Sequence, residues 1–305
     1  MKKIVYILFF VMVLASLKAQ QLPQYTQYML NEFAINPASA GRNQYAEMVS
    51  NNRYQWVGIV DAPRTYNLAV NGPMKNRNMG LGFNLFTDIV GPTRRVGFNL
   101  SYAYHIKLDQ DNKISMGLTA GILQWGIDGH KLTLHDSGDD NLLVQYQTVV
   151  VPDFGAGIMA HGKKYYLGIS IPQLYQSKLN LYSGGDSKSK LVTQVTVNGA
   201  YKFDLSDDFI LEPSVLLKWE KPAPIKYEGG LRLIYKQQVW IGGTYRYNDA
   251  WTALIGYMIK NYIMIGYSYD FSTTNIRKYS SGTHEIVLGL RFSRKQSKNW
   301  DSTDK

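Results

Sequence analysis

Hydrophobic and polar residues alternate along most of this chain, from about residue 45 to residue 293. One stretch carries large apolar residues at every second position: Val96, Phe98, Leu100, Tyr102, Tyr104 and Ile106. The positions between them hold small or polar residues. Because successive side chains of a β-strand point to opposite faces, this period of two predicts strands with one apolar face and one small or polar face. The pattern recurs in residues 114–122, 251–259, 263–271 and 286–292.

Fourteen segments with this pattern can be delimited along the chain. They are residues 45–55, 64–72, 79–88, 93–107, 112–125, 148–161, 164–172, 191–204, 208–219, 225–235, 238–247, 250–260, 261–271 and 282–293. Tight connections such as 109–112 and 260–261 alternate with long ones such as 126–150 and 272–283. An even number of strands with this asymmetry is typical of outer-membrane barrels. Since boundaries read from a sequence shift by a few residues, twelve and sixteen strands stay open.

A soluble β-sandwich would show the same alternation, but two features favour a barrel. The small or polar face repeatedly carries Gly, Asn, Ser, Arg and Glu, as a wet lumen would, and Tyr and Trp gather toward strand ends, as in interfacial girdles. An open sheet edge in lipid would leave backbone groups unpaired, so membrane-spanning strands must close into a ring. We predict an all-β fold, a closed antiparallel transmembrane β-barrel of about 14 strands with a short N-terminal periplasmic segment.

The composition agrees with a barrel and narrows the chemistry. The 305 residues include 23 Tyr and 27 Gly but no Cys, which excludes disulfides, thiolate metal sites and a Cys nucleophile. A helical membrane bundle would need unbroken apolar runs of about 20 residues, and the body of the chain alternates instead. The formal net charge of +10 comes from scattered Lys and Arg, which favours a polar lumen and rim over nucleic-acid binding.

The first residues have the three parts of a secretory signal peptide. Lys2 and Lys3 form a positive start, residues 4–15 are apolar, and Ala19 offers a small residue before Gln20. We expect residues 1–19 to be removed on export and the mature protein to reach the outer membrane. The remaining divisions are an N-terminal motif segment (20–44, a periplasmic plug or turn), the barrel (45–293) and a polar C-terminal tail (294–305).

Two short motifs precede the first predicted strand. They are QYxxYMLN at residues 24–31 and INPAxAG at residues 35–41, the second rich in turn-forming residues. Together with RYQW at 53–56 and APRT at 62–65, they resemble the PorP/SprF family of Bacteroidetes, which is associated with type IX secretion and gliding motility.

The resemblance implies a non-enzymatic outer-membrane component that supports export or surface attachment of proteins such as gliding adhesins. The implied partners are outer-membrane lipid, periplasmic ring and lipoprotein components, peptidoglycan-linked components and a dedicated secreted adhesin, with no cofactor and no nucleic acid. Five motif residues are the candidates for partner binding: Tyr25, Tyr28, Asn31, Asn36 and Pro37. The alternative function is a passive porin or small-solute channel.

The sequence offers weak signals for a calcium site and for a catalytic pair. Residues 136–141 offer oxygen ligands for Ca²⁺ in Asp136, Asp139, Asp140 and Asn141, but the stretch lacks the spacing and closing Glu of a calcium loop. A solvated surface loop is the better interpretation. Ser101 and His105 share a strand face but lie about 13 Å apart along an extended strand, too far for direct contact. We therefore predict no catalytic residue and no metal ligand.

Overall fold

The computed structural model describes residues 23–75, 78–131, 146–180, 189–221 and 223–292. The predicted signal peptide (1–19), the predicted tail (294–305) and the candidate calcium loop (136–141) lie outside the described residues.

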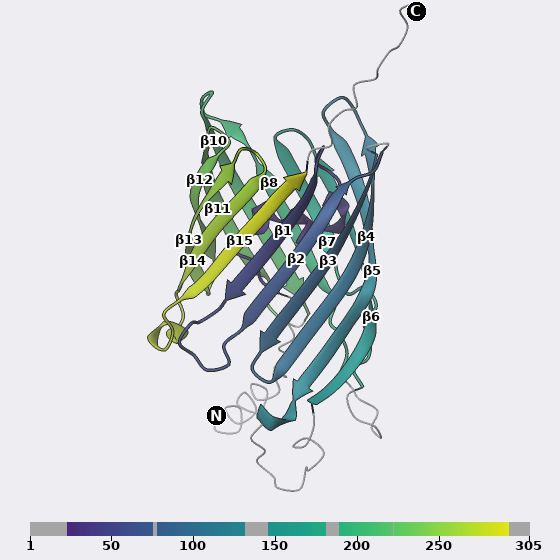
Figure 1. The fold of residues 1–305 in the computed structure, drawn as a ribbon, viewed down its shortest axis with the longest axis vertical. Helices are drawn as coiled ribbons and strands as arrows, with labels where there is room; N and C mark the ends of the chain where they lie inside the picture. Colours follow the sequence, from purple (N-terminus) through teal and green to yellow (C-terminus); the bar gives the residue numbers. More distant parts are fainter. Residues whose placement is uncertain (1–22, 76–77, 132–145, 181–188, 222, 293–305) are drawn as a thin grey trace, which may run out of the picture.

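Antiparallel strands close into one barrel, in which each strand pairs with its neighbours in sequence and the last pairs with the first (Figure 1). The strands are β1 (Ala46–Tyr54), β2 (Arg64–Pro73), β3 (Met79–Val90), β4 (Thr93–Lys107), β5 (Lys113–Asp128), β6 (Tyr146–His161), β7 (Tyr165–Ile171), β8 (Gln194–Tyr201), β9 (Phe203–Asp204), β10 (Phe209–Glu220), β11 (Lys226–Tyr235), β12 (Val239–Arg246), β13 (Ala250–Ile259), β14 (Ile263–Ser272) and β15 (Thr283–Phe292).

The short β9 continues β8 after an interruption at Lys202. Both pair with β10, whose register places Pro213 opposite Tyr201, next to the break, and Pro213 has no N–H to donate to the ladder. The Lys202 N–H donates to the carbonyl of Lys164 in the turn between β6 and β7. Counting β8 and β9 as one, the barrel has fourteen wall strands, which confirms the predicted closed antiparallel barrel and decides against twelve or sixteen.

The predicted alternation separates the outer and inner surfaces of the wall. Leu100 is 56% exposed and Leu118 65% exposed on the outside, whereas Ala103 and Ser115 are fully buried on the inside. Exposed aromatic side chains pair near the strand ends, with ring centroids 4.6 Å apart for Tyr227 and Tyr247. The outside is thus an apolar band with aromatic borders, the surface that a lipid-facing wall requires.

The two ends of the barrel differ as the connection lengths predict. The short-turn end, at the top of Figure 1, carries tight hairpins such as β11–β12 and β13–β14. Lys260 and Asn261 both have positive φ, the backbone of a tight hairpin turn whose twist matches the strands. The long-loop end carries the connections between β5 and β6, β7 and β8, and β14 and β15. Among the described residues, no helix is long and apolar enough to cross a membrane.

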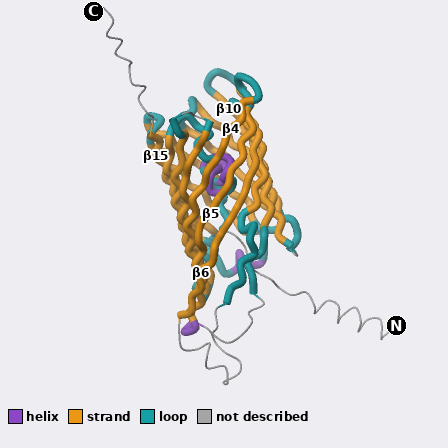
Figure 2. The backbone as a smooth tube through the Cα atoms, turned by 90° about the vertical axis from the view of Figure 1, so that its right-hand side faces the viewer, coloured by secondary structure: helices purple, strands orange, loops and turns teal. Residues whose placement is uncertain are grey.

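Residues 23–44, here named the luminal segment, lie inside the barrel, with three short 3₁₀ turns along them (Figure 2). These are η1 (Tyr28–Leu30), η2 (Glu32–Ala34) and η3 (Pro37–Ser39). The Pro23 carbonyl accepts a hydrogen bond from Lys218 near the long-loop end of β10. The Gly41 N–H donates to Asn71 near the short-turn end of β2. The segment therefore runs along the lumen from the long-loop end to the short-turn end and is not confined to one mouth.

Candidate functional site

The five motif residues singled out from the sequence all lie on the luminal segment and face the barrel wall. Tyr25, Tyr28, Asn31 and Asn36 are buried, and Pro37 is partly buried. Their contacts are made within the molecule, with strands that are distant in sequence. Their predicted role in partner binding stays a prediction, and in this structure it can act only through the segment that they hold in place.

Asn31 joins a local turn to two strands of the wall. Its Oδ1 accepts the backbone N–H of Ala34, which caps the start of η2. Its Nδ2 donates to Oδ1 of Asn51 on β1 at 2.7 Å and to Oδ1 of Asn67 on β2 at 3.1 Å. Because Asn carries both an acceptor and two donors, one buried side chain satisfies both tasks.

Asn36 repeats this arrangement on the opposite side of the lumen. Its Oδ1 accepts the N–H of Ala38 at 3.0 Å, and its Nδ2 lies 3.3 Å from the carbonyls of Ile158 and Ile169. Pro37 follows at the first position of η3, where its missing N–H leaves no bond unmade. The Asn-Pro motif thus starts a turn and binds it to β6 and β7.

Glycines on the inner wall make room for the segment. A Cβ atom on Gly80 would lie 1.9 Å from the Ala40 carbonyl oxygen, and one on Gly117 would lie 2.4 Å from the Ala38 nitrogen. A Cβ on Gly157 would lie 2.1 Å from Oδ1 of Asn36. The alternation in the sequence places small residues on this face, and the structure shows that they permit close backbone approach.

An apolar core fills the lumen beside η1. Tyr28 and Met29 pack with inward-facing side chains of the wall: Val49, Leu216, Trp240, Leu254, Met258, Met264 and Val287. The Tyr28 hydroxyl donates to Oγ of Ser214 at 3.0 Å. Part of the inner face is therefore apolar, in a place where the sequence predicted small or polar residues facing a lumen. The luminal segment brings apolar partners that remove these wall residues from water.

A buried charge cluster, here named the Thr26 cluster, holds the segment near the long-loop end. It consists of Thr26, Arg53, Arg246, Asp270 and Glu285, all at most 4% exposed. Nη2 of Arg53 lies 2.7 Å from Oδ2 of Asp270, and Nη1 of Arg53 donates to Oγ1 of Thr26 at 2.6 Å. These bonds join residues from β1, β12 and β14 around one hydroxyl of the segment.

Glu285 of β15 completes the cluster by accepting backbone bonds from the segment. Its two carboxylate oxygens accept the N–H groups of Thr26 at 2.7 Å and of Gln27 at 3.0 Å. Arg246 lies 2.9 Å from Glu228 of β11, which also accepts from Gln24 at 3.2 Å. Buried charges are tolerated where they are paired and hydrogen-bonded in this way.

The Thr26 cluster was not predicted as a site from the sequence. Its signal was visible as Arg and Glu on the small or polar face of the strands. The sequence does not show which of these residues contact one another. Thr26 and Glu285, for example, are 259 residues apart and meet only when the barrel closes.

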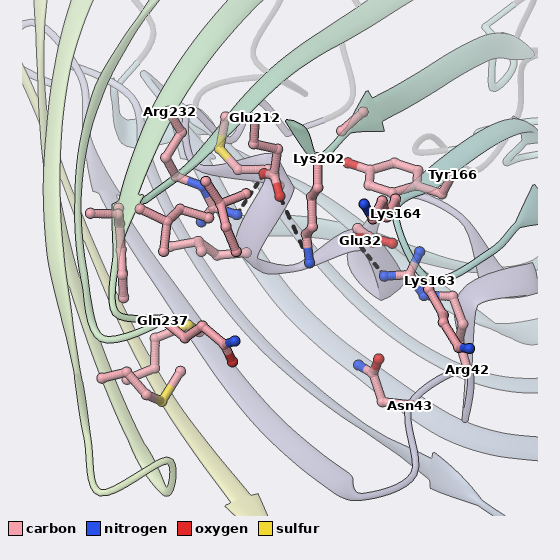
Figure 3. Close-up of a pocket in the computed structure, with 18 of the residues that line it drawn as sticks. Glu32, Arg42, Asn43, Lys163, Lys164, Tyr166, Lys202, Glu212, Arg232 and Gln237 are labelled. Atoms are coloured by element: carbon pink, nitrogen blue, oxygen red, sulfur yellow. Dashed lines mark hydrogen bonds and ion pairs between the residues drawn. The ribbon is translucent and has the colours of Figure 1, made fainter. Parts of the chain in front are cut away.

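A cavity of about 860 Å³ lies between the luminal segment and the short-turn end (Figure 3). Glu32 and Arg42 of the segment form an ion pair at 2.9 Å on one side. On the other, Glu212 of β10 accepts from Arg232 of β11 at 2.6 Å and lies 3.9 Å from the Lys202 ammonium. Seven basic and four acidic side chains line this space.

The disfavoured catalytic pair stays apart in the structure. Ser101 hydrogen-bonds to Thr119, while Nδ1 of His105 lies 2.6 Å from Oγ of Ser115, which also contacts His161. Within the described ranges, no group of three or more His, Cys, Asp or Glu side chains is placed to hold a metal ion.

Solved structures with a similar fold include bacterial outer-membrane barrels. The Ralstonia pickettii toluene transporter TbuX is 9% identical, over 88% of this chain and 93% of that chain, with a TM-score of 0.50. A Pseudomonas aeruginosa FadL homologue is 11% identical over 90% of this chain and 95% of that chain, with a TM-score of 0.48. At such identities the likeness to TbuX extends to the barrel fold alone. A comparison with curated proteins gives no match.

The sequence itself assigns the family. The family model described as type IX secretion system membrane protein PorP/SprF matches residues 17–290, which include the luminal segment and nearly the whole barrel. The resemblance carried by the two N-terminal motifs is thereby confirmed. The chain belongs to the PorP/SprF family of type IX secretion system membrane proteins.

Proposed function

We propose that this protein is a non-enzymatic outer-membrane component of type IX secretion that supports export or surface attachment of proteins by binding periplasmic and secreted partners. One observation carries the proposal. The luminal segment runs through the barrel, bonded to Glu285 near one end and to Asn71 near the other. Between these ends, Asn31 binds β1 and β2, and Asn36 binds β6 and β7 across the lumen. A barrel filled by its own chain suits protein binding better than passage of solutes.

The proposed orientation places the short-turn end in the periplasm and the long loops at the cell surface, the arrangement of outer-membrane barrels in general. The periplasmic ring, its lipoprotein and the peptidoglycan-linked components would meet the short turns, and a secreted adhesin would meet the long loops. The five motif residues would contribute by fixing the luminal segment between these two surfaces.

The second candidate is a passive porin, which the cavity at the short-turn end favours because it gives water access to part of the lumen. Purified protein in planar lipid bilayers separates the two functions, together with a mild-detergent pull-down from the native outer membrane and mass spectrometry. The proposal expects little conductance and co-purification of secretion components. Steady conductance without such partners would decide for the porin.

The role of the motif residues needs a test of its own. Replacing Asn31 and Asn36 together by Ala is expected to reduce secretion and surface adhesion at unchanged barrel abundance, because the segment loses bonds on both sides of the lumen. Gln44→Ala, at the exposed last position of the segment, is the control. Wild-type secretion and adhesion in the double variant would refute this role.

A further inference from the structure

The cavity at the short-turn end has the charge of a site for an anionic ligand. Its floor is the luminal segment, and its rim is formed by hairpin turns that include Lys163, Gln237 and Lys260. Turns from opposite sides of the barrel enclose it, so it opens along the barrel axis and not sideways through the wall. Its volume of about 860 Å³ is within the range of sites that enclose a ligand.

Three of the four acidic side chains of the cavity are paired with basic groups of the molecule, and the fourth, Glu47, accepts a hydrogen bond from the Asn71 amide at 3.1 Å. Glu32 pairs with Arg42 at 2.9 Å, and Glu212 pairs with Arg232 at 2.6 Å (Figure 3). Asp204 lies 2.6 Å from the Lys164 ammonium. With these acids occupied and basic groups in excess, the potential inside the cavity is positive, and low-dielectric walls strengthen it.

Several basic groups remain available to a ligand. Lys202 is half exposed and lies 3.9 Å from Glu212, whose closer partner is Arg232. Lys163 is 77% exposed, and its ammonium pairs at 2.5 Å with Asp111, which is half exposed and does not line the cavity. In the part of the chain that the structure describes, no acidic side chain lies within ion-pair distance of Lys260.

The wall also holds polar groups suited to a polypeptide. The Tyr166 hydroxyl and the Trp240 indole N–H are buried at the cavity and have no hydrogen-bond partner among the described residues. A buried donor left without an acceptor costs about 1–3 kcal/mol. Acceptors from a bound chain would reach these two groups once neighbouring side chains move aside, because neither atom has accessible surface in the free protein.

From this charge and shape we propose that the cavity binds an acidic segment of a periplasmic protein, a stretch of chain rich in Asp and Glu. The inference rests on the proposed function, which turns the short-turn end toward the periplasm and its protein partners. The axial opening favours a soluble chain over an anionic lipid headgroup, which would approach from the side of the wall. The luminal segment closes the floor, so the ligand docks there and does not pass through.

The test measures binding of a labelled glutamate-rich peptide to the purified full chain in detergent. The wild-type protein is expected to bind this peptide and not its glutamine counterpart, with an affinity that falls as salt is added. Replacing Lys163, Lys202 and Lys260 together by Gln is expected to weaken binding about tenfold, since three partly screened ion pairs are lost. All three positions are exposed, so the barrel is expected to fold.

Lys236→Gln is the matched control. Lys236 is on a hairpin turn at the same end and is exposed, but it does not line the cavity. Equal loss in this variant and in the triple variant would mean general charge attraction and would overturn the proposal. So would absence of peptide binding to the wild-type protein. Binding of short-chain phosphatidylglycerol, lost in the triple variant while the peptide is ignored, would also overturn it in favour of lipid.

Failure of the peptide site can be distinguished from failure of the proposed function. If secretion components co-purify and conductance is absent, but the acidic peptide does not bind, then the function stands and this site falls. If the peptide binds as expected while the protein conducts and brings down no secretion component, the site stands and the function falls.

Discussion

Asn36 combines a local and a long-range task at one buried position. Its amide starts η3 through the N–H of Ala38 and joins the segment to carbonyls of β6 and β7. Gly157 and Gly168 leave the space for this side chain, since a Cβ on either would lie within 2.5 Å of it. A motif residue and two wall glycines thus depend on one another, although they are far apart in sequence.

Asn36→Ala is expected to lower the free energy of unfolding by about 1–3 kcal/mol, because the N–H of Ala38 stays buried without its acceptor. The measurement is urea unfolding of the barrel in lipid or detergent, with Gln44→Ala as the exposed control. An unchanged unfolding midpoint in the Asn36 variant would contradict the assigned contacts.

Gly117→Ala tests the close approach of the luminal segment to β5. The added methyl would meet the backbone of Pro37 and Ala38 at about 2.4 Å, so the segment must shift or the wall must distort, at a cost of about 1–3 kcal/mol. We expect faster proteolysis of the segment and a measurable rise in bilayer conductance. Gly229→Ala is the matched control, because no atom lies within 4 Å of the new methyl there. Equal behaviour of the two variants would argue against the packing described.

Among the elements, the strands were predicted in detail, whereas the N-terminal segment was predicted only as a periplasmic plug or turn. The period of two fixes which side chains face lipid, and tight turns such as Lys260–Asn261 limit where strands can end, so all fourteen segments correspond to wall strands. The segment has no such period. Its residues pack against strands that are up to 259 residues away in the sequence. The motif alone does not specify which strands these are.

The interruption at Lys202 is a second difference between the predicted and the observed elements, and its cause also lies on another strand. The sequence predicts one continuous strand over residues 191–204, whereas the structure begins the strand at Gln194 and divides it into β8 and β9. The cause is Pro213 on the neighbouring strand β10, which removes one ladder bond. A strand's own alternation contains no information about a proline on its partner.

The Thr26 cluster makes a prediction that concerns β1, β14 and β15 together. Arg53→Ala would leave the buried carboxylates of Asp270 and Glu285 with less positive charge beside them, and breaking a buried pair in this way costs about 3–5 kcal/mol. We expect a lower urea midpoint and less folded barrel in the outer membrane. Replacing Glu285 by Gln in the same chain should recover part of the loss, since one unpaired charge is removed. Additive losses in the double variant would show that the two residues do not interact.

For the whole molecule, the orientation can be tested directly, because the chain contains no Cys. Val60→Cys places a thiol on a connection at the long-loop end, where the native side chain is 87% exposed. Lys163→Cys places one at the short-turn end. In intact cells a membrane-impermeant maleimide is expected to label the first and to reach the second only after the outer membrane is permeabilised. The reverse pattern would invert the proposed orientation.

The pairing of β1 with β15 has a consequence for how the molecule can be assembled. Arg53 and Glu285 are on these two strands, and both bind Thr26 of the luminal segment. Two routes can place the luminal segment inside the barrel. The segment can enter a barrel that has already closed, or the barrel can close around the segment. The second route lets the segment lie across the unfinished edges of the sheet and bring them together. By the second route, the segment first acts as a template on which β1 and β15 pair, and it then occupies the lumen of the closed barrel.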